Sequence, residues 1–132
     1  MSEVGGYVLR IAKEQWVDQV FNMTIYYSSM SRNWKHGQTI LFLHRTGVGD
    51  ALVGYGLIDR VCEKEQLSEP DKRECERGDW KRAIQFTYVK QFDKPLALKN
   101  TFLAKSKLRG RYFHGLKLTT KQIETLLTQA EA

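Results

Sequence analysis

The stretch Gln38–Val61, QTILFLHRTGVGDALVGYGLIDRV, holds two apolar segments on either side of a glycine-containing turn. Its first segment, Gln38–Arg45, has the length and the β-branched and aromatic content of a strand. The turn Thr46–Asp50 has the glycine spacing of a hairpin loop. It does not fit a dinucleotide-binding loop, because a helix would have to follow such a loop directly. The stretch therefore predicts a β-hairpin.

The second strand of this hairpin, Ala51–Val61, contains Gly54 and Gly56. Glycine inside a strand typically marks a bulge or a sharp bend, since it adds no side chain to the pleated surface. Bends of this kind let a sheet curl and close into a barrel. The hairpin therefore favours a small β-barrel that is closed or strongly curled.

Two further elements are predicted before the hairpin. Tyr7–Ala12, YVLRIA, alternates apolar and polar residues and is rich in strand formers, so we expect a first strand there. Lys13–Asn22 changes to a helical period, because its apolar residues share one face of a short helix. These residues are Trp16, Val17, Val20 and Phe21. Trp16 is therefore expected to anchor the helix to the core.

The chain after the hairpin begins with a charged segment, Glu63–Asp79, which contains Pro70 and Gly78. Its weak periodicity indicates mainly a solvated insertion, with room for a helical turn. Lys81–Asp93 alternates well and predicts a long strand. Pro95 is expected to end that strand, because proline has no N–H to donate to a neighbour.

The C-terminal part is predicted to end in a strand and a helix. Leu96–Phe102 is expected to be a connector, Lys105–Gly110 a basic loop and Tyr112–Leu118 a final strand. Thr119–Gln122, TTKQ, has the form of a capping box, so a helix should follow. Its apolar stripe would be Ile123, Leu126, Leu127 and Ala130. The pattern predicts one α+β domain over residues 1–132, with a mostly antiparallel, curled sheet flanked by helices.

The charge of this basic chain is unevenly distributed. Its 132 residues carry a formal net charge of +6, and the pI is near 9.4. No acidic residue occurs from Lys94 to Lys121, where basic residues recur, whereas acidic residues concentrate between Asp59 and Asp79. A basic face of this kind points to an anionic partner.

Several classes of protein lack their signatures here. No apolar run approaches the roughly 20 residues of a membrane helix, and no secretory signal is present, so we expect an intracellular, cytoplasmic protein away from membranes. Cys62 and Cys75 are too few and too far apart for a zinc site, and reduced thiols are expected, with a disulfide as the alternative. Common nucleotide, hydrolase and zinc-protease motifs are missing. We expect no metal and no cofactor.

The segment Asn22–Gly37, NMTIYYSSMSRNWKHG, is predicted to be a polar, aromatic loop between ordered segments. It carries Tyr26, Tyr27 and Trp34 among serines and cations. Flat π faces beside small hydroxyl donors suit a planar ligand such as a nucleobase, which offers a face to stack on and an edge to hydrogen-bond. The alternative is that these aromatics pin a long loop to the core.

Taken in order over nearly the whole chain, these features resemble the EVE family of PUA-like domains, which is related to the YTH readers of methylated adenine. The matching stretches are EQW, the aromatic and serine-rich loop, ILFLHR, VGYGLID, DWKRAIQFTYVKQFDKPL and LTTKQIETLL. The resemblance implies a closed or nearly closed barrel with helices covering its ends. It also implies recognition of a modified or flipped-out base, in RNA or DNA, without catalysis.

The resemblance further implies a base pocket. Tyr26, within IYYSS, falls where YTH domains have the first cage tryptophan, and Trp80, within GDWK, falls at the second cage position. The third cage aromatic would fall at Cys75, so a complete methyladenine cage is not implied. The predicted pocket comprises Tyr26, Tyr27, Ser28, Ser29, Trp80, Ala12, Lys13, His44, Arg45 and Trp34. The predicted phosphate contacts are Lys105, Lys107, Arg109 and Arg111.

Each of these residues also has a purely structural interpretation. Trp80 fits a core residue at a strand start, His44 a hydrogen-bonded structural histidine, Trp34 a barrel plug, and the basic loop a solvated segment.

Two other functions also stay open. One is an enzyme like the related ASCH group, acting on RNA or modified nucleosides, for which Asp50, Asp59 and Asp79 would have to converge. The other is an interaction subunit of a modification-dependent restriction system. We expect a monomeric, non-catalytic domain with no catalytic residues.

Overall fold

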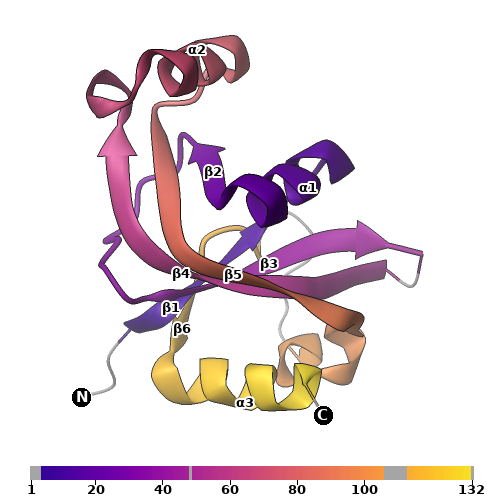
Figure 1. The fold of residues 1–132 in the computed structure, drawn as a ribbon. Coiled ribbons are helices and arrows are strands. Elements are labelled where there is room, and N and C mark those ends of the chain that lie inside the picture. The colour runs from indigo at the N-terminus through magenta and orange to yellow at the C-terminus, as the bar shows by residue number, and fades with distance from the viewer. Residues whose placement is uncertain (1–3, 48, 106–112, 132) are drawn as a thin grey trace.

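The computed structural model describes residues 4–47, 49–105 and 113–131. It contains a six-stranded mixed sheet with the strand order β2-β5-β4-β3-β1-β6. The strands are β1 (Val4–Arg10), β2 (Ile25–Ser28), β3 (Thr39–Thr46), β4 (Gly49–Glu63), β5 (Arg82–Ala97) and β6 (Leu116–Thr119). The helices are α1 (Glu14–Met23), α2 (Glu69–Gly78) and α3 (Thr120–Ala130). Figure 1 shows the sheet strongly bent, with α3 at one end of the molecule and α2 at the other.

The sheet is curled but not closed, so the predicted closed barrel is wrong. Its edge strands β2 and β6 have four residues each, and each pairs with one neighbour, β5 and β1 respectively. A barrel closes only when the two edges meet over a matching stagger. In the described sheet, the edge strands β2 and β6 do not pair with each other. The mixed α+β class and the curl are confirmed.

Two apolar cores form on the two faces of the sheet, because successive side chains of a strand point to opposite faces. In β1, Tyr7 and Leu9 pack in the same cluster as Val17 and Val20 of α1. Val8 packs instead with Ile123 and Leu126 of α3, among other residues. The predicted buried faces of both helices are therefore confirmed. The strand β1 lies parallel to β3, and α1 is part of the connection between them.

The glycines of the predicted curl lie close to other elements. A Cβ on Gly54 would lie 2.4 Å from the carbonyl oxygen of Lys90 and 2.5 Å from the ring of Phe21. Glycine at this position therefore lets α1 approach the sheet. The pairing of β4 with β5 also shifts register between Leu52 and Gly54, as the predicted bulge requires.

Two boundaries differ from the prediction. The strand β5 does not stop before Pro95 but continues to Ala97. The register shift of β5 lies between Gln91 and Leu96, so Pro95 falls in a stretch without paired positions and its missing N–H costs no ladder bond. The aromatic loop is also not a loop throughout, because Ile25–Ser28 forms the edge strand β2.

The charged insertion folds into a 3₁₀ turn, Lys64–Gln66, and the three-turn helix α2. Proline in the first turn of α2 is compatible with a helix, because the first N–H groups have no intrahelical partner. One side chain, Cys75, is fully buried and holds α2 on the sheet. The sequence prediction missed this helix because a single small apolar residue gives almost no helical period.

The start of α3 follows the prediction closely. The Oγ1 atom of Thr119 accepts a hydrogen bond from the N–H of Gln122 at 3.2 Å, and the Gln122 side chain accepts one from the Thr119 N–H at 2.9 Å. The predicted capping box is confirmed. Within the described residues, no helix is long and apolar enough to cross a membrane.

Candidate functional site

An open hollow of about 560 Å³ lies where β2 meets the junction of α2 and β5. It is formed because β2 pairs antiparallel with the first residues of β5, which places Ser28 opposite Arg82. Residues 26–30 and 78–80 thereby come together although about fifty positions separate them. We call this space the Trp80 hollow; it is lined by Tyr26, Tyr27, Ser28, Ser29, Met30, Gly78, Asp79, Trp80 and His114.

The Trp80 ring is held in place by its neighbours. It stacks on Tyr27 with ring centroids 5.6 Å apart and planes 11° apart, and it meets Trp16 edge to face at 5.3 Å. Gly78 lies directly against the indole, since a Cβ on Gly78 would be 2.4 Å from its ring carbons. The backbone N–H of Trp80 donates to the carbonyl of Cys75 at 2.8 Å. This half-buried ring is therefore a fixed wall of the hollow.

Tyr26 and Tyr27 occupy different environments. The Tyr27 hydroxyl donates to Oδ1 of Asp71 at 2.8 Å, and burial followed by this hydrogen bond raises the pKa of Tyr27. Tyr26 is only 9% exposed and packs in the core with α1, and burial raises its pKa to about 12. Both phenols are therefore protonated at neutral pH.

The stacked pair of Tyr27 and Trp80 leaves no slot between its rings. Carbon atoms in contact lie about 3.5–4.0 Å apart, so a base between two rings needs a spacing of about 7 Å. The observed centroid separation is 5.6 Å. A planar ligand in this hollow therefore rests against the outer parts of the rings and does not insert between them.

The hydroxyls of Ser28 and Ser29 are engaged with the backbone. Ser28 Oγ accepts from the N–H of Met30 at 2.9 Å, and Ser29 Oγ donates to the carbonyl of Asp79 at 3.1 Å. Ser28 is buried, whereas Ser29 is exposed. The second bond ties the two walls of the hollow together. Ser28 still has its hydroxyl hydrogen to donate, and Ser29 still has lone pairs that accept.

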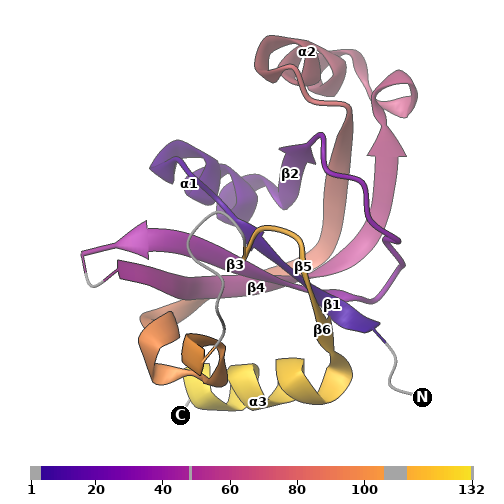
Figure 2. The same ribbon diagram turned by 180° about the vertical axis from the view of Figure 1, so that it is seen from behind.

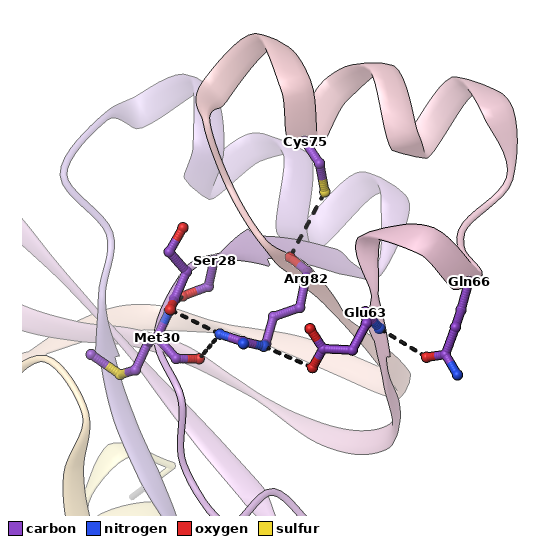
Figure 3. A network of polar contacts seen from close by, with 7 residues as sticks. Ser28, Met30, Glu63, Gln66, Cys75 and Arg82 are labelled. Carbon is purple, nitrogen blue, oxygen red and sulfur yellow. Dashed lines mark hydrogen bonds and ion pairs between the residues drawn. The ribbon is translucent and has the colours of Figure 1, made fainter.

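The Arg82 side chain binds the backbone of the same segment (Figure 3). Its Nη1 donates to the carbonyls of Ser29 at 2.8 Å and Met30 at 2.7 Å, and its Nε donates to Glu63 Oε1 at 3.2 Å. The Arg82 side chain is 13% exposed. One guanidinium therefore holds two consecutive backbone carbonyls of the hollow, and its positive charge is compensated by Glu63.

His114 lines the hollow and was not predicted as a site residue. The backbone N–H of Arg10 donates to His114 Nδ1 at 2.9 Å, so Nδ1 carries no hydrogen and Nε2 does. Burial, followed by the charges of Arg32 and Arg10, lowers the pKa of His114. The ring is therefore a neutral donor. No sequence motif marks this histidine; it reaches the hollow because the chain pairs with β1 there, with the Gly115 N–H donating to the Val8 carbonyl.

Five predicted pocket residues, His44, Arg45, Trp34, Ala12 and Lys13, do not line the Trp80 hollow. His44 Nδ1 bonds to the carbonyl of Ile11 at 2.7 Å, and Arg45 is exposed in the β3–β4 hairpin. Trp34 packs edge to face on Tyr7 at 5.0 Å, and its Nε1 is buried without a hydrogen-bond partner among the described residues. Ala12 is exposed just before α1.

Lys13 lies beside the neighbouring ring of Trp16, with its Nζ 5.0 Å from the ring centroid, and Trp16 in turn packs against Trp80.

The predicted phosphate contacts are only partly within the described residues. Lys107, Arg109 and Arg111 lie outside them. Lys105 is exposed in a 3₁₀ turn, Phe102–Lys105, beside α3. Figure 2 shows this turn at the α3 end of the molecule, away from α2. Lys105 is therefore distant from the Trp80 hollow.

The three acids named for an enzyme have separate surroundings. Asp50 pairs with Arg10 at 3.3 Å, Asp59 lies 3.7 Å from His36, and Asp79 lines the Trp80 hollow. In the part of the chain that the structure describes, no three histidine, cysteine or acidic residues gather as a metal ion would need.

Comparison with known proteins relates this chain to ASCH structures. The ASCH protein from Zymomonas mobilis superposes with a TM-score of 0.66 at 11% identity over 92% of both chains. A serine-to-alanine mutant of it gives 0.69 at 11% identity over 98% of this chain and 99% of that one. A hypothetical protein from Leishmania major gives 0.66 at 16% identity over 98% and 96%.

The sequence comparisons add no closer relative. No family model matches the sequence. No curated protein matches it significantly. Identities of 11–16% relate folds and do not carry function. The EVE resemblance stays a prediction, and the chain shares the fold of the ASCH structures.

Proposed function

We propose that this protein is a non-catalytic nucleic-acid-binding domain that takes an unpaired or flipped-out base into the Trp80 hollow. One observation carries the proposal. Aromatic rings and polar groups from residues 26–30, residues 78–80 and His114 converge on one open space. A base has a π face for stacking and an edge for hydrogen bonds, which is the combination that this lining offers.

The base rests on the outer surface of Trp80, because the space between Tyr27 and Trp80 is closed. Tyr26, 9% exposed, contributes its accessible edge. Stacking of one base on an aromatic side chain is worth about 1–3 kcal/mol. A methylated base with a delocalised positive charge gains more from the same π faces, which supports a modified base as the preferred ligand.

Hydrogen bonds to the base edge come from side chains fixed by the backbone. His114 Nε2–H and the Ser28 hydroxyl are donors for a carbonyl oxygen or a ring nitrogen of the base. Ser29 Oγ and the Asp79 carboxylate are acceptors for an amino group. Because backbone hydrogen bonds hold His114, Ser28 and Ser29 in position, these three side chains lose little entropy on binding.

The net charge of +6 supports an anionic polymer as the ligand. Phosphate contacts set affinity and its salt dependence but carry no sequence information. We assign that role to the predicted Lys105, Lys107, Arg109 and Arg111. Of these, Lys105 lies in the 3₁₀ turn beside α3, and the other three lie outside the described residues. RNA and modified DNA are both within the proposal.

The test compares two half-buried tryptophans that both pack against apolar clusters, of which only Trp80 lines the hollow. We expect Trp80→Leu to weaken binding of mixed-sequence single-stranded 12-mers about tenfold, about 1.4 kcal/mol. Trp34→Leu should change the affinity less than twofold. The probes are RNA and DNA, each with and without 1-methyladenine, a methylated base with a delocalised positive charge. Affinity is measured by fluorescence anisotropy on variants shown to be folded by circular dichroism.

Equal losses in both variants, or no loss in Trp80→Leu, would remove the Trp80 hollow from the proposal. The same 12-mers and modified nucleosides, incubated with the wild-type protein, should be recovered intact by mass spectrometry. Turnover of any of them would refute the non-catalytic assignment.

A further inference from the structure

A second hollow, of about 460 Å³, adjoins the Trp80 hollow. It lies between the first turn of α1, with Lys13 and Trp16, and the last turns of α2, with Glu74 and Arg77. Trp80 and Gly78 line both hollows, so the indole ring is their common wall. We call this second space the Trp16 hollow.

We infer that the Trp16 hollow receives a second nucleotide of the strand whose base enters the Trp80 hollow. The inference rests on the proposed function and deepens it, because it turns a site for one base into a site for two consecutive nucleotides. Trp16 is the second stacking surface, and Lys13 is the contact to the phosphate.

The stacking surface is visible in the contacts of Trp16. This half-buried ring meets Trp80 edge to face, at 5.3 Å and 76°. Lys13 Nζ lies 5.0 Å from the Trp16 centroid, over the ring, so the ring accepts a partner from the solvent side. A base that stacks there takes the place of the ammonium group, which is then released toward the phosphate. Stacking of this kind does not depend on which base is present.

The charges of the Trp16 hollow leave one cation uncompensated. Arg77 is 2.8 Å from Glu74 and is neutralised by it. Lys13, which is exposed, forms no ion pair among the described residues. One free positive charge beside an aromatic ring matches the one phosphate that each nucleotide brings.

The chemistry of this lining favours a nucleotide over an apolar ligand. Charged and amide side chains at the start of α1 and the end of α2 surround the rings of Trp16 and Trp80. A lipid tail or an apolar peptide would leave these groups desolvated without partners. A strand of nucleic acid instead brings a planar base and a charged backbone in the same order as Trp16 and Lys13.

The experiment measures how affinity grows with ligand length. Wild-type protein should bind a single-stranded tetranucleotide at least tenfold more tightly than the matching mononucleoside, tested with RNA and DNA of the same sequence. Lys13→Gln should lower the tetranucleotide affinity about fivefold and reduce the slope of log affinity against log salt by about 1. It should leave mononucleoside affinity unchanged. The control is Lys99→Gln, an exposed lysine in the 3₁₀ turn Leu98–Asn100 beside α3.

Three results would decide against the inference, and they separate it from the proposed function. If Lys13→Gln keeps the full tetranucleotide affinity, or if wild type binds nucleoside and tetranucleotide equally, the second subsite is refuted while the Trp80 hollow stands. If the wild-type protein binds no nucleic acid of any length, the proposed function and the inference fall together. Thermal denaturation of both variants checks that the fold is intact.

Discussion

The indole of Trp80 stacks on the phenol of Tyr27, and not on Tyr26, with planes 11° apart. Neighbouring residues of a strand point to opposite faces, so β2 directs Tyr26 into the core with α1 and Tyr27 toward α2. The stack therefore joins the edge strand to the α2–β5 junction. It is the packing contact that sets the shape of the Trp80 hollow.

Tyr27→Phe should separate the hydroxyl of this residue from its ring. The variant loses the 2.8 Å hydrogen bond to Asp71 but keeps the stack on Trp80. We expect the free energy of unfolding to fall by about 1 kcal/mol in urea titrations, with nucleic-acid affinity changed less than twofold. A tenfold loss of affinity would mean that the Tyr27 hydroxyl itself contacts the ligand.

Tyr26 should make the protein sensitive to alkaline pH. Its pKa is raised from 10.0 to about 12 by burial, so the unfolded chain loses this proton at lower pH than the folded one. The contribution to stability is complete below pH 10 and is lost as the pH rises toward 12, by about 2–3 kcal/mol in total. Tyr26→Phe should show a flatter decline of unfolding free energy over this range. Parallel declines for variant and wild type would contradict the expectation.

Arg82→Lys should loosen one wall of the hollow while keeping its charge. Lysine cannot reproduce the guanidinium geometry that donates to Ser29, Met30 and Glu63 together. We expect a loss of about 2 kcal/mol in unfolding free energy and weaker nucleic-acid binding. Hydrogen exchange should speed up at residues 28–30 more than in α3, which serves as the internal reference.

His114 should donate a hydrogen bond in its neutral form, and its protonation at low pH should weaken nucleic-acid binding. Its lowered pKa means that the folded state disfavours protonation, so stability is present above the unfolded value of 6.5 and falls as the pH drops through the folded pKa. Protonation at Nδ1 also breaks the bond from the Arg10 N–H. Binding should therefore weaken only as the pH falls through the lowered pKa of His114, and not already at pH 6.5.

Two variants separate the two nitrogens of His114. Asparagine places its side-chain oxygen near the Nδ1 position and loses the distal donor, whereas glutamine places its amide near Nε2. We expect His114→Asn to stay folded with weaker binding, and His114→Gln to keep more of the affinity. Equal affinities for wild type and His114→Asn would exclude the Nε2 donor from recognition.

Gly78→Ala should displace the Trp80 ring. The added methyl would lie 2.4 Å from the indole carbons, so the ring has to move and both hollows change shape. We expect weaker nucleic-acid binding and an altered tryptophan fluorescence spectrum. Gly47→Ala is the matched control, because a Cβ at Gly47 meets nothing within 4 Å. Unchanged binding in Gly78→Ala would argue against a fixed Trp80 wall.

Local patterns in the sequence predicted most helices and strands, but not whether the sheet closes into a barrel. The helical stripe of α1, the long strand β5 and the capping box of α3 depend on neighbouring residues, and all three are confirmed. The curl is confirmed, and only the closed alternative of the barrel prediction is wrong, because the four-residue edge strands β2 and β6 do not pair with each other in the described sheet. Pro95 was misjudged because its tolerance comes from a register shift between β4 and β5.

The candidate site was predictable only where it follows the chain. The segment Tyr26–Ser29 and Trp80 line one hollow, whereas the partner of each ring depends on which face of β2 it occupies. His114 had no sequence motif, since its role comes from a backbone N–H of β1 more than a hundred positions away. Arg82 likewise acts on carbonyl groups, which leave no trace in the sequence.

The walls of the Trp80 hollow come from residues 26–30 and 78–80, so the hollow exists only in the folded chain. A ligand that binds there binds the native state and not the unfolded one. By mass action it must then raise the melting temperature, with about 2.7 kcal/mol of added stability at a ligand concentration one hundred times Kd. The melting temperature of the protein therefore reports ligand binding without a label, and its shifts with different modified nucleosides would rank the bases that the protein prefers.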